Sequence, residues 1–227
     1  MAAVVSVENV TRRYRRGVET VTALDDVSLD LFAGELTVAA GPSGSGKTTL
    51  LNVIAGIETP DTGRVAPGED LPPDVPPAAL GWRHLAFVPQ ALALLDELTV
   101  AENIDLPARL HDQVDGWPLD DLMEELEIAH LAHRYPSRTS GGEQQRTAVG
   151  RALRLRPRLL IGDEPTGHQD RARVDLVLDI LRRHAYAGHA VLISSHDEAV
   201  IAAADRVVTL ADGRVVSDVR QHAGARW

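Results

Sequence analysis

The chain has 227 residues, of which 44% are hydrophobic, enough for one large α/β domain or two small ones. Its 33 acidic and 23 basic residues give a formal net charge of −10, which argues against a nucleic-acid partner because phosphate contacts need clustered Lys and Arg. The absence of cysteine excludes a disulfide framework and a cysteine-ligated metal site.

Membrane and targeting signals are missing from the sequence. No run approaches the ~18 consecutive apolar residues of a membrane span. Residues 1–8 lack the basic start and long apolar segment of a secretory signal. We therefore expect a protein that is soluble by itself and reaches a membrane only through a partner chain. Two basic runs, at 12–16 and 151–158, are each interpreted first as a solvated charged face.

The first ninety residues favour strands around one helix. Strands are expected at 4–7 and 27–31, where apolar and polar residues alternate, and at 36–40, which is continuously apolar. A helix is expected over 49–55, followed by a turn at 59–63. Five prolines between residues 66 and 80 exclude regular helix or inner strand, so this segment is expected to be an extended surface loop.

The rest of the chain alternates helices and strands. Helices are expected over 99–135, 143–155 and 171–184, and strands over 85–88, 159–161, 190–194 and a hairpin at 206–216 closed by Asp212-Gly213. This alternation predicts an α/β fold with a mostly parallel sheet, antiparallel hairpins at the edges and a helical insert. We expect a single domain, with a core of about 1–90 and 140–227 and a helical subdomain of about 91–139.

A glycine-rich segment between the strand at 36–40 and the following helix fits the pattern G-x-x-x-x-G-K-[ST]. Glycines let backbone N–H groups turn toward phosphate oxygens, and the helix start adds its dipole. Lys47 can reach the β- and γ-phosphates, and the Thr48 hydroxyl can ligate Mg²⁺. The segment consists of Gly41, Pro42, Ser43, Gly44, Ser45, Gly46, Lys47 and Thr48.

Two carboxylates, Asp163 and Glu164, follow the apolar strand at 159–161. Ligands of a parallel sheet lie beyond the carboxyl ends of its strands. Asp163 is therefore a candidate to hold the Mg²⁺ shell, and Glu164 a candidate to orient an attacking water and accept its proton. Without the phosphate loop, two surface acids would be the better interpretation.

A second candidate anion site begins the helix near 143, where Ser140, Gly141, Gly142 and Glu143 follow one another. Small residues at a helix N-terminus expose N–H groups to an anion. A capping box between Ser140 and Glu143 also explains the pattern, and both interpretations can hold. A second anion site is useful if it faces the nucleotide of another subunit.

These segments together resemble the nucleotide-binding subunit of ATP-binding-cassette (ABC) transporters. The resemblance covers nearly the whole chain and rests on segments 41–49, 140–144, 159–165 and 194–197. It implies an ABC fold with a phosphate-loop NTPase core, ATP and Mg²⁺ as ligands, and ATP hydrolysis.

The resemblance assigns roles to further residues. It implies that Tyr14 stacks on adenine, that Thr49 belongs to the nucleotide site, and that Gln90 contacts Mg²⁺ and the attacking water. It also implies that His196 contacts the γ-phosphate and the catalytic carboxylate. The plainer alternatives are a core tyrosine, a surface glutamine and an exposed histidine.

The resemblance implies a head-to-tail homodimer that buries two ATP molecules. Lys47, Mg²⁺ and His196 of one subunit, with Ser140 and Gly142 of the other, would surround each γ-phosphate, and Asp170 would lie in a loop that crosses the interface. Hydrolysis would open the dimer and drive a separate transmembrane permease from the cytoplasmic face of the membrane.

Some residues depart from the family pattern. Thr139 stands where leucine opens the signature segment, and His168 and Gln169 replace the usual Asn-Leu or Ala-Leu. The proline-rich stretch is also unlike the usual strand-and-turn segment. Coupling across the dimer is therefore less firmly implied than ATP binding.

Segments 21–29 and 94–104 look like the lipoprotein-release and macrolide-efflux branch, which implies export or mechanotransmission. Four leucines after Gln90 would either form a groove for the permease or pack in the core. They are Leu92, Leu94, Leu95 and Leu98. The alternative function is a soluble ABC-type switch in DNA repair or on ribosomes, without a permease.

Overall fold

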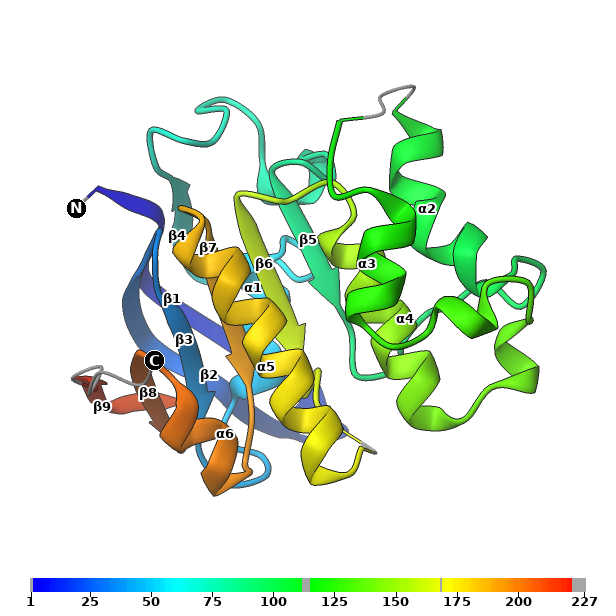
Figure 1. Cartoon of the computed structure of the whole chain (residues 1–227). Helices are drawn as coiled ribbons and strands as arrows, with labels where there is room; N and C mark the ends of the chain where they lie inside the picture. Colours follow the sequence, from blue (N-terminus) through cyan, green and yellow to red (C-terminus); the bar gives the residue numbers. More distant parts are fainter. Residues whose placement is uncertain (1, 112–114, 168, 222–227) are drawn as a thin grey trace.

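A computed structural model describes residues 2–111, 115–167 and 169–221 (Figure 1). Its strands are β1 Ala3–Arg16, β2 Glu19–Phe32, β3 Leu36–Ala40, β4 Thr62–Pro67, β5 Leu85–Val88, β6 Leu159–Asp163, β7 Ala190–Ser194, β8 Arg206–Ala211 and β9 Arg214–Arg220. Its α-helices are α1 Lys47–Ile54, α2 Val100–Leu110, α3 Leu119–Glu125, α4 Gly141–Leu153, α5 Arg171–Tyr186 and α6 Glu198–Ala203.

The strands form two sheets. A six-stranded sheet has the order β5-β6-β7-β3-β8-β9, in which only the edge strand β9 runs antiparallel to its neighbour. A smaller antiparallel sheet has the order β2-β1-β4. The predicted α/β class, with a mostly parallel sheet and antiparallel edges, is confirmed.

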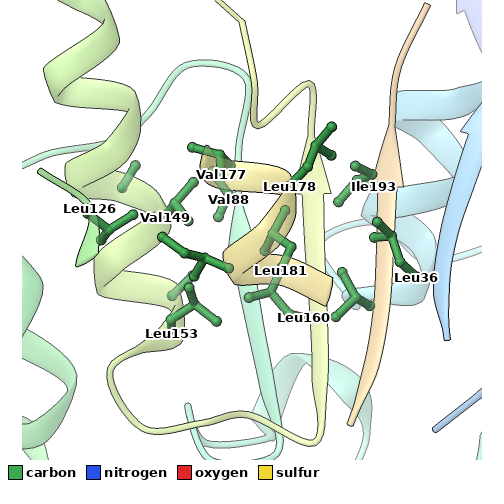
Figure 2. Packing of buried hydrophobic residues seen from close by; sticks show 14 of the residues in the cluster. Leu36, Val88, Leu126, Val149, Leu153, Leu160, Val177, Leu178, Leu181 and Ile193 are labelled. Carbon is green, nitrogen blue, oxygen red and sulfur yellow. The ribbon is translucent and has the colours of Figure 1, made fainter. Parts of the chain in front are cut away.

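The central strand β3 divides the core between the two faces of the large sheet. Leu36, Val38 and Ala40 pack with α2, α3, α4 and α5, whereas Ala39 packs with α1 and the antiparallel sheet. This alternation is the period of two that a strand imposes on its side chains. Figure 2 shows Leu178 and Leu181 of α5 lying over the strands on the first of these faces.

Strand register brings the functional loops to one edge. Asp163 at the end of β6 pairs with Ser194 at the end of β7, and Ser194 pairs with Ala39 near the end of β3. Because parallel strands end on the same side, the phosphate loop, the acidic pair and the segment with His196 leave the sheet together.

Several expected elements differ in the structure. The helix expected over 99–135 is two helices, α2 and α3, separated by a segment that contains Gly116 and Pro118, and short 3₁₀ turns follow. β1 is much longer than residues 4–7, and its pairing with β2 shifts register at several points along its length. β4 and α6 were not predicted. The proline-rich loop is confirmed, apart from its first residues in β4 and one 3₁₀ turn.

The interpretation of residues 151–158 as a solvated face is wrong for Arg151 and Arg154, which are both buried. Arg151 donates hydrogen bonds to the carbonyls of Leu92 and Ala93 at 2.8 and 2.7 Å. Arg154 bonds the Asp105 carboxylate at 2.9 Å. Burial lowers the pKa of Arg151, and its hydrogen bonds satisfy the guanidinium where water is excluded. These arginines join α4 to the helical segment rather than facing solvent.

Acid should destabilise the fold through a stacked histidine pair. The rings of His184 and His189 lie 4.3 Å apart, and burial, then His189, lower the pKa of His184 from 6.5 to about 3. Below pH 6.5 the His184 side chain is protonated in the unfolded chain, whereas in the folded chain it is protonated only near pH 3. Stability falls over that window by up to about 1.4 kcal/mol per pH unit.

Urea unfolding between pH 7.5 and 4.5 measures this effect. A His184→Phe variant should lose less unfolding free energy on acidification than the parent, whereas the exposed His133→Phe control should match the parent. Equal pH slopes for the parent and His184→Phe would contradict the assignment.

Candidate functional site

The phosphate loop has a backbone that only glycine accommodates at two positions. Gly41 has φ 142°, and a Cβ there would lie 2.2 Å from the Leu210 carbonyl oxygen. Gly46, which precedes α1, has φ 105°, and its Cβ would lie 2.4 Å from the carbonyl oxygen of Ala23. The loop is thus built into the fold by close backbone contacts, as a phosphate-binding turn requires.

The loop and the start of α1 present donors for an anion. Lys47 is buried, and its Nζ donates to the carbonyls of Gly41 and Pro42 at 2.8 and 2.9 Å. No side chain caps α1. The buried Ser45 hydroxyl lacks a hydrogen-bond partner within the described structure. An ammonium, free helix N–H groups and an orphan hydroxyl are what a triphosphate needs.

Thr48 and Asp163, the two residues proposed for the Mg²⁺ shell, lie in direct contact. The Thr48 hydroxyl donates to Asp163 Oδ2 at 2.8 Å, although 115 residues separate them in the sequence. A hydroxyl beside a carboxylate fits Mg²⁺, which prefers oxygen ligands and keeps several water and phosphate ligands. Within the residues that the structure describes, no three acidic, histidine or cysteine side chains are grouped to hold a metal ion.

Glu164 and His196 are also brought together. His196 Nδ1 lies 2.8 Å from Glu164 Oε1. The Glu164 side chain is half-buried, whereas His196 is largely exposed at the end of β7. Glu164 has φ 50°, an unusual backbone for a residue with a side chain, and such backbones are enriched at functional sites.

Ser194 connects the two carboxylates and was missed by the sequence reasoning. Its hydroxyl donates to Asp163 Oδ1 at 2.6 Å and accepts from the backbone N–H of Glu164 at 2.9 Å. The available signal was a hydroxyl residue at the end of a buried strand. This bridge fixes the direction of the turn that carries Glu164.

The segment Ser140–Glu143 forms the predicted capping box of α4. The Ser140 N–H donates to Glu143 Oε2 at 2.7 Å, and the Glu143 N–H donates to Ser140 Oγ at 3.4 Å. These bonds lower the pKa of Glu143. No hydrogen bond of the described residues joins this segment to Lys47, Thr48 or Asp163. Ser140 and Gly141 are exposed, and so open to another molecule.

Gln90 was also expected near the Mg²⁺ site of Thr48 and Asp163. It is exposed after β5 and lines a groove of about 390 Å³, together with Gly141 and Gln144 of α4 and residues of the segment after β5. The described hydrogen bonds include none from its side chain to Thr48 or Asp163. Its role toward Mg²⁺ therefore stays a prediction.

The residues that depart from the family pattern have partners. The Thr139 hydroxyl donates to the Pro136 carbonyl at 2.8 Å, which satisfies the polar group that replaces leucine. Arg146 of α4 donates to Gln169 Oε1 at 3.3 Å. Asp170 caps α5 by accepting from the Arg173 N–H at 3.0 Å. His168 lies outside the described residues.

Tyr14 is half-buried in β1, and its hydroxyl contacts two side chains. It donates to Glu58, and its oxygen lies 3.4 Å from Thr49 Oγ1. Burial and then the bond to Glu58 raise the pKa of Tyr14. Glu58 was not predicted as a site residue, because it lies just before a turn and matches no motif. Tyr14 is thus tied to the helix that carries the phosphate loop.

Comparison with known proteins agrees with this geometry. Residues 24–167 match the family described as ABC transporter. The Macrolide export ATP-binding/permease protein MacB of Burkholderia pseudomallei is 38% identical over 224 residues, which cover 95% of this chain and 34% of that protein. MacB 1 of Yersinia pestis is 37% identical over 227 residues, again 34% of its length. The chain therefore spans about a third of these relatives.

Solved structures extend the similarity to the whole fold. A dimeric, post-hydrolysis structure of the ATP-binding cassette MJ0796 with ADP and Pi has a TM-score of 0.84 and 30% sequence identity, covering 95% of this chain and 98% of that one. A second dimeric structure of MJ0796 has a TM-score of 0.82 and 31% identity.

Proposed function

Since this chain belongs to the ABC transporter family, we propose that it binds and hydrolyses ATP as one half of a head-to-tail homodimer and drives a separate membrane permease. The observation that carries the proposal is the meeting of Thr48 with Asp163 and of Glu164 with His196 at the carboxyl edge of one sheet. Phosphoryl transfer needs this combination of charge stabilisation and positioning.

Each residue has a distinct task in hydrolysis. Lys47 exchanges its loop carbonyl partners for β- and γ-phosphate oxygens. Thr48 and Asp163 would hold Mg²⁺, which would supply positive charge to neutralise the phosphate oxygens. Glu164 orients a water and accepts its proton as the water oxygen attacks the γ-phosphorus, and the bond from that phosphorus to the bridging oxygen breaks so that ADP leaves. His196 holds the Glu164 carboxylate at the γ-phosphate side.

The signature tip completes the site from the second copy. Ser140 and Gly142 stand at the exposed start of α4, where a capping box already fixes the backbone. Their hydroxyl and N–H groups would meet the γ-phosphate bound by the partner copy. The MJ0796 structures are dimeric, which supports a dimer of this chain.

The permease proposal is supported by the relatives' names, which join ATP binding to a permease for macrolide export. Among the helices of the described residues, none is long and apolar enough to span a bilayer. Export or mechanotransmission is the proposed action, with the chain held at the cytoplasmic face through the permease.

The groove beside Gln90 is the proposed permease contact. It is lined by Leu92 and Leu94, which also pack against the core. Core packing is thus observed for these two leucines, and their contact with the permease stays a proposal. Leu95 lies between groove residues and is 42% exposed. Buried Asn103 fixes this segment through its side chain, which bonds the Leu95 N–H and carbonyl at 2.9 and 3.0 Å.

Purification from detergent-solubilised membranes tests this contact. The tagged chain should recover a membrane-spanning permease, identified by mass spectrometry, and Leu95→Asp should lose it while keeping ATP turnover. Leu110→Asp, a matched change at an exposed leucine at the end of α2, should retain the permease. Recovery of ribosomes or DNA-repair proteins in place of a permease would favour the soluble switch.

A further inference from the structure

Among the residues that the structure describes, no third strand pairs with the tip of the β1–β2 hairpin. β4 pairs with β1 from Val5 to Thr11, and beyond Thr11 the pairing recorded for β1 within 2–111, 115–167 and 169–221 is with β2. Tyr14 lies in this outer part, opposite Val21. A two-stranded ribbon twists readily. Sheet pairing therefore does not by itself fix Tyr14 relative to the phosphate loop.

Glu58 supplies the missing connection. It accepts the hydroxyl of Tyr14, and its other oxygen accepts Asn52 Nδ2 of α1 at 3.0 Å. The Tyr14 oxygen also lies 3.4 Å from Thr49, in the first turn of α1. The carboxylate thus joins the hairpin tip to the helix that starts at Lys47.

Arg12 completes the cluster on one side of the tyrosine ring. Its Nε lies 3.3 Å from Glu58, and its guanidinium carbon is 5.0 Å from the centre of the Tyr14 ring. Asp61 anchors the same segment by accepting the Arg13 N–H and pairing with Arg12 at 3.3 Å. With a cation over one face of the ring, a nucleobase would stack on the other.

The negative charge of Glu58 strengthens the hydrogen bond that holds Tyr14. Burial disfavours the ionised form of Glu58, but hydrogen bonds from Tyr14, Asn52 and Arg12 prevail and lower its pKa. Glu58 is thus a carboxylate at neutral pH, and a charged acceptor holds the tyrosine hydroxyl more strongly than a neutral one.

We propose that Glu58 is a positioning residue for the nucleobase, holding the Tyr14 ring at a set distance and angle from the phosphate loop through its bonds to Tyr14 and Asn52. The inference rests on the proposed function, in which Tyr14 stacks on the base of ATP. Preorganisation of the ring lowers the cost of ordering it when the nucleotide binds.

Comparison of a ligand that has a base with one that lacks it tests the proposal. Calorimetry of the full chain with Mg-ADP and with magnesium pyrophosphate measures both affinities without turnover. Glu58→Ala should weaken ADP binding about 10-fold, the loss expected for a hydrogen bond to a charged group, and leave pyrophosphate binding unchanged. In steady-state hydrolysis the KM for ATP should rise by a similar factor, with kcat retained.

Further variants separate positioning from a general structural role. Glu58→Gln keeps an acceptor for Tyr14 and should restore most of the ADP affinity. Tyr14→Phe keeps the ring and loses the hydroxyl, so it should match Glu58→Ala, and the double variant should be no weaker than either. Glu8→Ala, which removes a carboxylate paired with Arg64 across β1 and β4, should bind ADP normally.

Three outcomes would overturn the inference: unchanged ADP affinity in Glu58→Ala, equal loss of ADP and pyrophosphate affinity, or additive losses in the double variant. If Lys47→Ala weakens both ligands while Glu58→Ala weakens neither, the proposed function stands and the role of Glu58 fails. If Lys47→Ala weakens neither ligand, the proposed function fails.

Discussion

Replacing Glu164 by glutamine should leave ATP bound, slow hydrolysis about a thousand-fold and accumulate a dimer. The substitution keeps the shape of the side chain and removes the carboxylate that accepts the water proton, a contribution of general-base catalysis of that order. Lys47, Thr48 and Asp163 do not depend on this carboxylate for their contacts, so nucleotide affinity should persist. Phosphate-release assays measure turnover, and light scattering with Mg-ATP measures the mass.

The accumulated dimer also tests which residues face the partner. Ser140→Ala in the Glu164→Gln background should abolish the dimer, because it removes a donor to the neighbouring γ-phosphate. The matched control is Thr99→Ala, which destroys the equivalent capping box of α2 by removing the Thr99 hydroxyl that accepts the Glu102 N–H at 3.3 Å. If both changes weaken the dimer equally, the effect is helix destabilisation. A Glu164→Gln protein that stays monomeric at saturating Mg-ATP would contradict the head-to-tail arrangement.

Local motifs explain why much of the site could be predicted. The phosphate loop is contiguous, and its glycines are dictated by close contacts with Leu210 and Ala23 that leave a visible residue pattern. Asp163, Glu164 and His196 follow short apolar strands, and the rule that parallel strands end together is enough to group them. The structure brings these side chains to one edge of the sheet, while their catalytic roles stay proposals.

Residues whose role depends on distant partners could not be predicted. Ser194 bridges Asp163 and Glu164 from about thirty residues away, and Glu58 bonds a tyrosine 44 positions earlier. Glu58 lies in no periodic pattern or glycine-rich motif, and Ser194 is marked only as a hydroxyl residue at the end of an apolar strand. The prediction that Arg151 is exposed was wrong for the same reason. A run of charged residues predicts exposure to solvent, but carbonyls nearly 60 residues away in the sequence accept hydrogen bonds from the buried Arg151 guanidinium.

Replacing Lys47 by alanine should weaken ATP binding on the order of 100-fold, because it removes charge-assisted hydrogen bonds worth about 3 kcal/mol in total. The ammonium is buried, and carbonyls of the loop itself hold it in place. The compact ammonium of lysine fits between the loop carbonyls and the phosphates. The planar guanidinium of arginine needs more room, so the Lys47→Arg variant should also bind ATP poorly. Calorimetry at constant ionic strength measures both affinities.

Lys47 is the only lysine of the sequence, which permits a direct test on the unaltered protein. Apart from the N-terminal amine, Nζ is the sole amino group that an amine-reactive reagent can modify, so peptide mass spectrometry reports its accessibility without interference. Mg-ATP should protect Lys47 and leave the N-terminal amine reactive. Arg64→Ala, which removes one positive charge from β4, should bind ATP like the parent and so separates a local contact from the overall field. Two results would contradict phosphate binding by this loop: unchanged ATP affinity in Lys47→Ala, or labelling of Lys47 that ATP does not slow. Either result would also contradict the roles proposed for Thr48, Asp163 and Glu164, which depend on a phosphate bound beside them.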